Sequence, residues 1–183
     1  MDTQELINEL SELTLSNMKE AQEFLALSKE KLNRQPSSGS WSVLACIEHL
    51  NRYGDFYIPE IKSRLEKSRT KPSETFQPGL LGNYFAKSML PKEKLNTMRT
   101  FQAMNPLDSL LDKQVLDRFI VQQREILMLL DKARAVDLAK IKTSISISKW
   151  IKLRLGDTFR VVVYHNLRHI VQAKKALTLI SPS

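Results

Sequence analysis

The chain has 183 residues, a length typical of one domain, and we expect a single domain over residues 1–183. Hydrophobic residues make up 42% of the chain and charged residues 26%, a composition that excludes an intrinsically disordered protein. No apolar run approaches the length of a membrane span, and only 5 glycines and 7 prolines are present, which favours long helices over a β fold.

The first helix is predicted from Asp2 to about Leu32. Asp2 is a good N-cap, and Glu5 stands three residues later, where it completes a capping box. Apolar residues at helical spacing predict the buried face: Leu6, Leu10, Leu13, Phe24, Leu25 and Leu32. The helix should end in residues 33–40, which contain a proline, a glycine and several serines.

A second helix is predicted after Trp41, with Ser42 as its N-cap, and it should fade near Lys67. Pro59 lies inside this pattern and is expected to kink the helix. Residues 69–106 hold four prolines and two glycines, so we expect an irregular crossing with one short helix near residues 80–89. A loop of this length in a compact domain usually covers the core or takes part in function.

A third long helix is predicted from Leu107 to Ala135. Its apolar positions recur at helical spacing: Leu110, Leu111, Val115, Phe119, Ile126, Leu127 and Leu130. Residues 141–147 alternate between apolar and polar like an extended strand, and Asp157 is the predicted N-cap of a fourth helix that runs to about Leu179. The predicted fold class is all-α, an antiparallel four-helix bundle. The long crossing between its second and third helices would allow a non-sequential helix order.

The formal net charge of +8 raises the question of a polyanionic partner. The lysines and arginines are spread along the chain, and many stand near predicted helix C-termini, where the helix dipole favours cations. The chain lacks zinc-finger spacing, an aromatic RNA-binding run and a convincing helix-turn-helix, so nucleic acid is not an expected partner. A basic helical module that binds a polyanion or a partner protein remains an alternative function.

The chain has three histidines, His49, His165 and His169. His165 and His169 are four residues apart in the fourth helix, so their rings leave the same face one turn apart. That face also carries apolar residues: Val161, Val162, Ala173, Ala176 and Ile180. The opposite face, which we expect to meet solvent, carries polar ones: Arg160, Tyr164, Arg168, Lys174 and Lys175.

Two adjacent imidazoles in a core need hydrogen-bond partners or a bound ion for their ring nitrogens. Neutral imidazole binds divalent cations well. His49 stands at the margin of the apolar face of the second helix, and ligands from facing helices of a bundle can converge on one point. The residues alone leave two hypotheses open: one three-histidine site for Zn, Ni or Fe, or three histidines that are hydrogen-bonded separately.

Several neighbours have a structural interpretation beside a functional one. Cys46 shares the side of His49 and could ligate a metal as a thiolate, but a small buried hydrophobe is the preferred interpretation. Tyr53 and Phe56 are spaced to line a pocket or to pack in the core. One turn beyond His169 stands a glutamine that is a candidate donor to a bound water, namely Gln172.

Trp41 is expected to pack as a structural staple before Ser42.

Several of these residues also carry a resemblance to a known family. The pair Trp41-Ser42 at the start of a helix, the run Glu48-His49-Leu50 and the run from Tyr164 to His169 with Gln172 one turn later together resemble the DinB-like (YfiT-like) family. This resemblance implies a four-helix bundle, often a homodimer, with a metal site formed by His49, His165 and His169. Water would fill the open metal positions, and some members are thiol-dependent S-transferases or isomerases.

Three protein ligands with open positions are typical of catalytic sites, where a bound water or thiol becomes a nucleophile. The sequence therefore predicts a metal-dependent enzyme of the thiol-dependent S-transferase or hydrolase type. Its substrate would be a small molecule, used with a low-molecular-weight thiol if the reaction is S-transfer. No general base is evident, and a member whose metal is only structural is a third hypothesis. The lone Cys46 and an N-terminus without a signal pattern lead us to expect a cytoplasmic protein.

Overall fold

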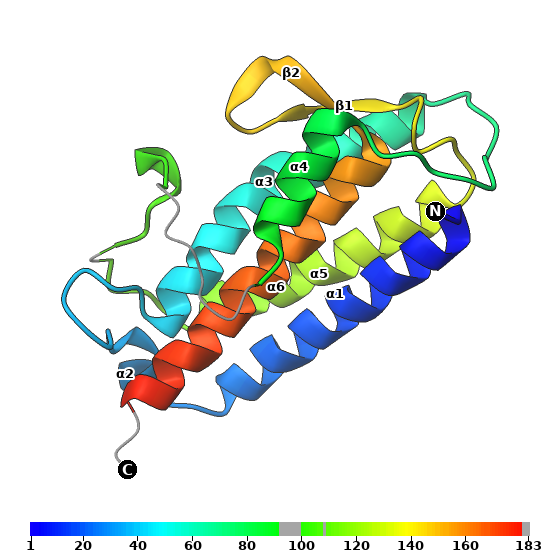
Figure 1. Ribbon diagram of the computed structural model, residues 1–183. Coiled ribbons are helices and arrows are strands. Elements are labelled where there is room, and N and C mark those ends of the chain that lie inside the picture. The colour runs from blue at the N-terminus through cyan, green and yellow to red at the C-terminus, as the bar shows by residue number, and fades with distance from the viewer. Residues whose placement is uncertain (92–99, 108, 181–183) are drawn as a thin grey trace.

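The computed structural model describes residues 1–91, 100–107 and 109–180, and the chain in these ranges is mostly helical (Figure 1). The elements in chain order are α1 (Thr3–Leu25), α2 (Lys29–Asn33), α3 (Val43–Lys67), α4 (Leu80–Met89), the 3-10 turn η1 (Gln102–Met104), α5 (Gln114–Ala133), β1 (Lys142–Ile145), β2 (Ser148–Arg154) and α6 (Leu155–Ile180). The second helix and the short helix therefore lie where the sequence predicts them. Part of the predicted crossing, residues 92–99, lies outside the described residues.

The long helices α1, α3, α5 and α6 lie side by side (Figure 1). α1 packs against α5 and α6, and α3 packs against the same two helices, so α1 and α3 occupy opposite corners. The order in space is thus non-sequential, as the long crossing between α3 and α5 permits. α4 packs on the outer face of α6.

The predicted mostly helical character is confirmed, and a small antiparallel hairpin of β1 and β2 is added to it at the start of α6. Lys142 pairs with Arg154, and the register shifts between Ser144 and Ile145. The extended character of residues 141–147 is confirmed, but the sequence pattern gave no sign of its partner strand.

The predicted first helix is too long, because α1 ends at Leu25 and a separate short helix, α2, begins at Lys29. The hydroxyl of Ser28 accepts a hydrogen bond from the backbone N–H of Lys31 at 3.2 Å, so Ser28 is the N-cap of a new helix. At the N-terminus of α1 the predicted cap is confirmed, since the Asp2 carboxylate accepts from the N–H groups of Gln4 and Glu5.

The predicted third helix also begins too early, since α5 starts at Gln114 rather than at Leu107. The side-chain amide of Asn33 binds both backbone groups of Leu111, at 2.8 Å to its C=O and 3.1 Å to its N–H. These groups are therefore not available for a helical ladder. Leu110, a predicted core position, is 85% exposed as a result.

Asp157 does not cap the fourth helix, which begins two residues earlier at Leu155. Its side chain is fully buried and accepts a hydrogen bond from the N–H of Gly79, the N-cap residue of α4, at 2.8 Å. Asp157 also pairs with Arg160 at 3.1 Å. Its role is to join the start of α4 to α6.

The core consists of two apolar clusters with polar side chains between them. The first apolar cluster includes Leu10, Ile61, Ile126 and Phe159, and the second includes Phe24, Leu44, Phe119 and Ile170. Along each long helix, buried polar residues stand between the two clusters and form a polar layer: Thr14, Asn17, Asn51, Gln122, Gln123 and Asn166. α3 and α6 run in opposite directions, because the start of α3 and the end of α6 share the second cluster.

Most of the polar layer is hydrogen-bonded within the protein. Asn166 donates to the side-chain oxygen of Gln123 at 3.1 Å, and the Asn51 amide donates to the carbonyl of Val115 at 2.9 Å. The Asn17 side chain differs, because neither of its polar atoms has a hydrogen-bond partner among the described residues although it is fully buried.

Replacing Asn17 by leucine is expected to raise the free energy of unfolding by about 1–3 kcal/mol, because a buried amide without partners costs about that much and leucine has the same branched shape. Urea denaturation monitored by circular dichroism measures the change. Asn166→Leu is the matched control on α6, and it should destabilise the fold because the Gln123 oxygen loses its donor. Destabilisation by both substitutions would contradict the prediction.

Candidate metal centre

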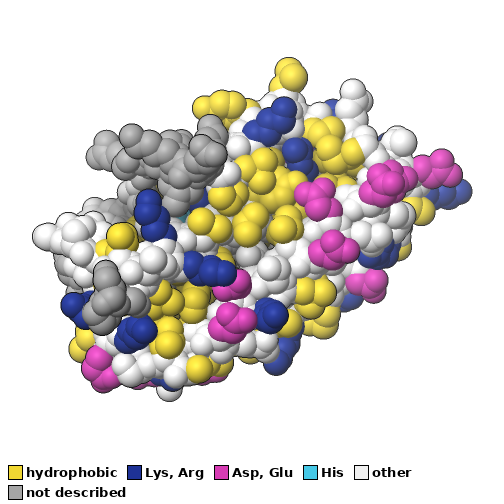
Figure 2. Space-filling model, turned by 60° about the horizontal axis from the view of Figure 1, so that its bottom comes forward, with side chains coloured by type: hydrophobic (Ala, Val, Ile, Leu, Met, Phe, Trp, Pro, Cys, Tyr) yellow, Lys and Arg dark blue, Asp and Glu magenta, His cyan; other side chains and the backbone are white. Residues whose placement is uncertain are grey.

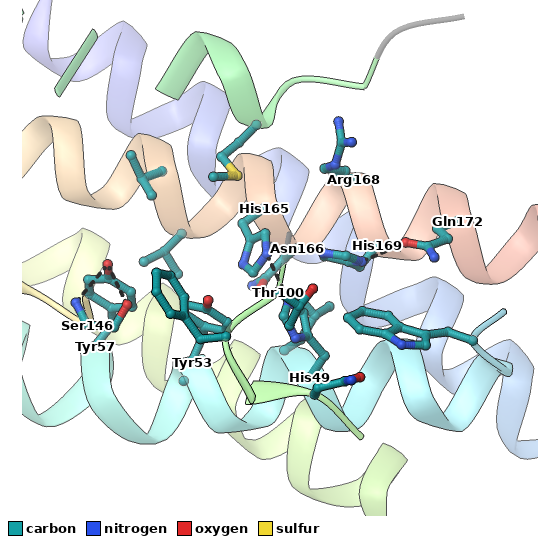
Figure 3. Close-up of a pocket in the computed structure, with 18 of the residues that line it drawn as sticks. His49, Tyr53, Tyr57, Thr100, Ser146, His165, Asn166, Arg168, His169 and Gln172 are labelled. Atoms are coloured by element: carbon teal, nitrogen blue, oxygen red, sulfur yellow. Dashed lines mark hydrogen bonds between the residues drawn. The ribbon is translucent and has the colours of Figure 1, made fainter. Parts of the chain in front are cut away.

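The three histidines meet beside the polar layer, between α3 and α6 (Figure 3). His49 comes from the second turn of α3, whereas His165 and His169 stand one turn apart on α6. The Nε2 atoms of His49 and His165 are 3.2 Å apart, and one nitrogen of each ring lies within 4.8 Å of the other two. The structure therefore brings together the three residues that the sequence selected as candidate ligands.

Hydrogen bonds to the other ring nitrogens orient two of these histidines. The Nδ1 atom of His49 lies 2.7 Å from the carbonyl oxygen of Met104, which can only accept, so Nδ1 carries the proton. The Nδ1 atom of His169 lies 2.9 Å from the side-chain oxygen of Gln172 and donates to it in the same way. A neutral ring protonated at Nδ1 has its lone pair on Nε2. His49 and His169 are therefore held as Nε2 ligands.

The donor set fits a divalent transition metal. Metal–nitrogen bonds of about 2.0–2.1 Å in tetrahedral geometry place two nitrogens roughly 3.3 Å apart, close to the 3.2 Å between the Nε2 atoms of His49 and His165. Neutral imidazoles suit Zn, Ni or Fe, whereas Mg and Ca prefer oxygen ligands. Within the described ranges, the three histidines form the cluster without a carboxylate or thiol.

Burial keeps the three imidazoles neutral. Desolvation lowers the pKa of His49 to about 4 and the pKa of His169 to about 3. The pKa of His165 also falls well below its ordinary value, first through desolvation and then because a proton on this ring would repel protons on His169 and His49. Neutral imidazole is the form that binds metals, so no proton has to be displaced at neutral pH.

Two aromatic rings enclose the histidines. The Trp41 ring centroid lies 4.7 Å from that of His49 and 5.5 Å from that of His169. Tyr53 stands on the other side, 4.9 Å from His49 and 4.8 Å from His165. Sequence reasoning gave Trp41 only a structural role. Trp41 precedes the N-cap of α3, so helical spacing does not place it, and the signal that could have placed it at the site is the pair Trp41-Ser42 in the DinB-like pattern.

The remaining neighbours of the histidines divide between site and core. Phe56 packs against the first apolar cluster and Tyr57 rather than facing the histidines. Cys46 belongs to the second apolar cluster, where burial raises the pKa of its thiol, which matches the expected small hydrophobe. Gln172 contacts the site as expected, but it accepts a hydrogen bond from His169. Glu48 turns toward α5 and pairs with Arg52 and Arg118.

The face of α6 expected to meet solvent is largely buried, which corrects the helical-wheel prediction for Arg160, Tyr164 and Arg168. α4 and α1 cover this face and supply polar partners. Arg160 donates to the Asn83 side chain at 3.0 Å, and the Tyr164 hydroxyl donates to the Glu9 carboxylate at 3.0 Å. A single-helix pattern could not reveal this, because the partners come from other elements.

A pocket of about 730 Å³ opens beside the three histidines. Trp41, Tyr53 and Gln172 contribute to its wall, together with residues from α5, from the hairpin and from residues 100–107. The histidine cluster can therefore be reached by a small molecule. Among the described residues that line the pocket, none is an aspartate or a glutamate, so a carboxylate base is not found there.

These features define a mostly helical protein with a candidate metal centre on the wall of a pocket. A family model described as the DinB superfamily matches residues 12–173, which is most of the chain. The chain belongs to the DinB superfamily, and the resemblance noted in the sequence is confirmed. No significant match was found among curated proteins or solved structures. None of the described helices is long and apolar enough to cross a membrane.

Acid is expected to destabilise the metal-free protein between pH 6.5 and 5. The unfolded chain binds protons at its histidines near pH 6.5, whereas the fold does not bind them until the pH approaches the lowered pKa values, about 4 for His49 and about 3 for His169. The free energy of unfolding is therefore not lowered by the histidines above about pH 6.5, where they are neutral in both states. It decreases as the pH falls below that value. Each histidine contributes up to about 1.4 kcal/mol per pH unit.

Urea denaturation of chelator-treated protein at several pH values measures this slope. The variant with His49→Gln, His165→Gln and His169→Gln is the control, and its stability should depend much less on pH in this range. An equal slope in both proteins would contradict the assignment of three buried neutral imidazoles.

Proposed function

We propose that the protein is a divalent-metal-dependent enzyme that acts on a small molecule, with His49, His165 and His169 as the metal ligands. The observation that supports this most directly is the convergence of three imidazole rings, two of them held as Nε2 ligands, on the wall of a pocket. Membership of the DinB superfamily is compatible with metal binding.

Three protein ligands favour a catalytic over a structural site, because structural zinc is normally closed by four. A bound divalent ion would lower the pKa of a water or a thiol in the pocket and so supply a nucleophile at neutral pH. The protein's own contribution is positional: Met104 and Gln172 hold the rings of His49 and His169, and Trp41 and Tyr53 shield the cluster.

Thiol-dependent S-transfer is the leading reaction class, as the resemblance implies, and hydrolysis by a metal-activated water is the second. Either reaction needs a nucleophile beside the substrate, and the open pocket next to the histidines gives room for both molecules. The exposed apolar side chains of α4, Leu80 and Tyr84, are compatible with the homodimer that the resemblance also implies.

The rival function, a basic module that binds a polyanion, gains less support from the charge distribution. Basic and acidic side chains are interspersed on the face shown in Figure 2. Several of the basic residues are paired with acidic ones, as in Lys29–Asp112, Arg64–Glu60, Arg118–Asp55, Lys140–Asp137 and Lys174–Glu20. Such pairing reduces the local positive potential that polyanion binding requires.

Chelator-treated protein without a histidine tag is expected to bind one Zn, Ni or Co ion per chain. His165→Ala should weaken binding by more than about 100-fold, because loss of even an indirect contact to a ligand costs about 10–100-fold. Isothermal titration calorimetry and elemental analysis measure both quantities. Co additionally gives a visible spectrum that reports the coordination geometry.

Val171→Ala is the matched control for this titration, since Val171 is a partly exposed residue of α6 outside the pocket lining. The metal affinity of Gln172→Leu should lie between those of His165→Ala and Val171→Ala, with a loss of about 10–100-fold. Equal affinity of His165→Ala and Val171→Ala would remove the proposed ligand set.

Catalysis is expected to require the metal. We expect turnover when a low-molecular-weight thiol such as cysteine is offered with an aryl halide, or when an aryl ester is offered with water. Turnover should appear on adding the metal and disappear in His165→Ala. Turnover that is equal with and without metal would contradict metal dependence. Stoichiometric metal binding without turnover of either kind would favour a purely structural ion.

A further inference from the structure

The pocket extends along α3 and α6 on both sides of the histidines. His49, Tyr53 and Tyr57 follow one another at one-turn intervals along α3, and Figure 3 shows the two tyrosines on one side of the histidines and Gln172 on the other. We call the part of the pocket on the tyrosine side the apolar lobe. The residues that define it are Tyr53, Tyr57, Ile126, Ile145, Leu153 and Val162.

The apolar lobe is built from four elements that the sequence does not bring together. α3 supplies the tyrosines, α5 supplies Ile126, and α6 supplies Val162 one turn before His165. The hairpin supplies Ile145 and Leu153, so its place at the start of α6 closes the end of the lobe. Ile126, Ile145 and Leu153 are each less than 5% exposed, which makes the lobe enclosed as well as apolar.

The lobe is also uncharged. The charged residues among the described pocket-lining residues are Arg168 and Lys175, which lie beyond His165 along α6, away from the tyrosines. The polar groups on the tyrosine side are neutral hydroxyls and amides: Tyr57 accepts from the backbone N–H of Ser146 at 3.4 Å, and the Gln122 amide lies against Gly54.

Such a lobe selects its occupant by desolvation. An apolar group gains about 0.8 kcal/mol for each methylene removed from water, whereas a charged group would lose its hydration without an opposite charge to replace it. The volume of the whole pocket, about 730 Å³, lies in the range of sites for drug-sized molecules.

We propose that the substrate is an uncharged molecule with an apolar alkyl or aryl body that occupies the apolar lobe and places its reacting group at the three histidines. This inference rests on the proposed function for its reacting group. The binding of the apolar body does not depend on the metal, because the lobe residues are not the candidate ligands. The two ideas can therefore fail separately.

The neutral fluorescent amine N-phenyl-1-naphthylamine is the probe, titrated into chelator-treated and into metal-loaded protein at pH 7.5. We expect a saturable rise in emission with one site per chain in both forms. In the chelator-treated form, 1-hexanol, 1-heptanol and 1-octanol should displace the probe with an affinity that rises about fourfold per methylene. The carboxylates of equal length should bind at least about tenfold more weakly.

Two hairpin variants locate the site. Ile147→Asp adds a charge at a lining position that is 49% exposed, so folding should not suffer, and it should weaken probe binding by about tenfold. Ile151→Asp is the matched control, since Ile151 is 37% exposed in the same hairpin but does not line the pocket, and it should bind the probe like the unaltered protein.

Three outcomes would overturn the inference: no saturable probe binding, carboxylates that bind as tightly as the alcohols in the chelator-treated form, or equal effects of Ile147→Asp and Ile151→Asp. If the probe binds as expected but the metal titration fails, the apolar lobe stands and the proposed function falls. If the metal binds and the probe does not, the proposed function stands and the inference about the apolar lobe falls.

Discussion

The neutrality of three buried imidazoles is the constraint on which the rest of this structure depends. Each ring has lost most of its hydration, so each nitrogen needs a partner inside the protein. The protein supplies partners for the outer nitrogens of His49 and His169 through Met104 and Gln172, and directs their inner nitrogens to one point. A shared divalent ion would satisfy these inner lone pairs together, which is why the arrangement points to metal-based chemistry.

The polar layer divides the helical core beside the histidines. Two apolar clusters fix the long helices on either side of this layer of amide side chains. Asn166 and Gln123 bond each other at that level and also line the pocket. The pocket thus extends from the polar layer into the first apolar cluster, whose residues line its apolar lobe.

Short elements between the long helices complete the site. The backbone carbonyl of Met104, in the crossing between α3 and α5, orients His49. The hairpin closes the apolar lobe, and α4 covers the outer face of α6 and gives Arg160 a partner. These segments have the weakest sequence patterns, yet they shape the pocket in which a substrate would lie. The hairpin contributes apolar residues to the uncharged lobe of that pocket.

The sequence by itself determined the elements whose signals are local. Caps at Asp2 and Ser42, the short helix at residues 80–89 and the inward face of His165 and His169 follow from spacing and side-chain chemistry, and the histidines follow from their scarcity and their match to the DinB-like pattern. Only the tertiary structure decided the late start of α5, which depends on Asn33 binding Leu111 seventy-eight residues away. It likewise decided the burial of Arg160 and Tyr164 and the place of Trp41 against the histidines. In each of these cases the partner lies on another element, and periodicity along one helix carries no information about which element will pack against it.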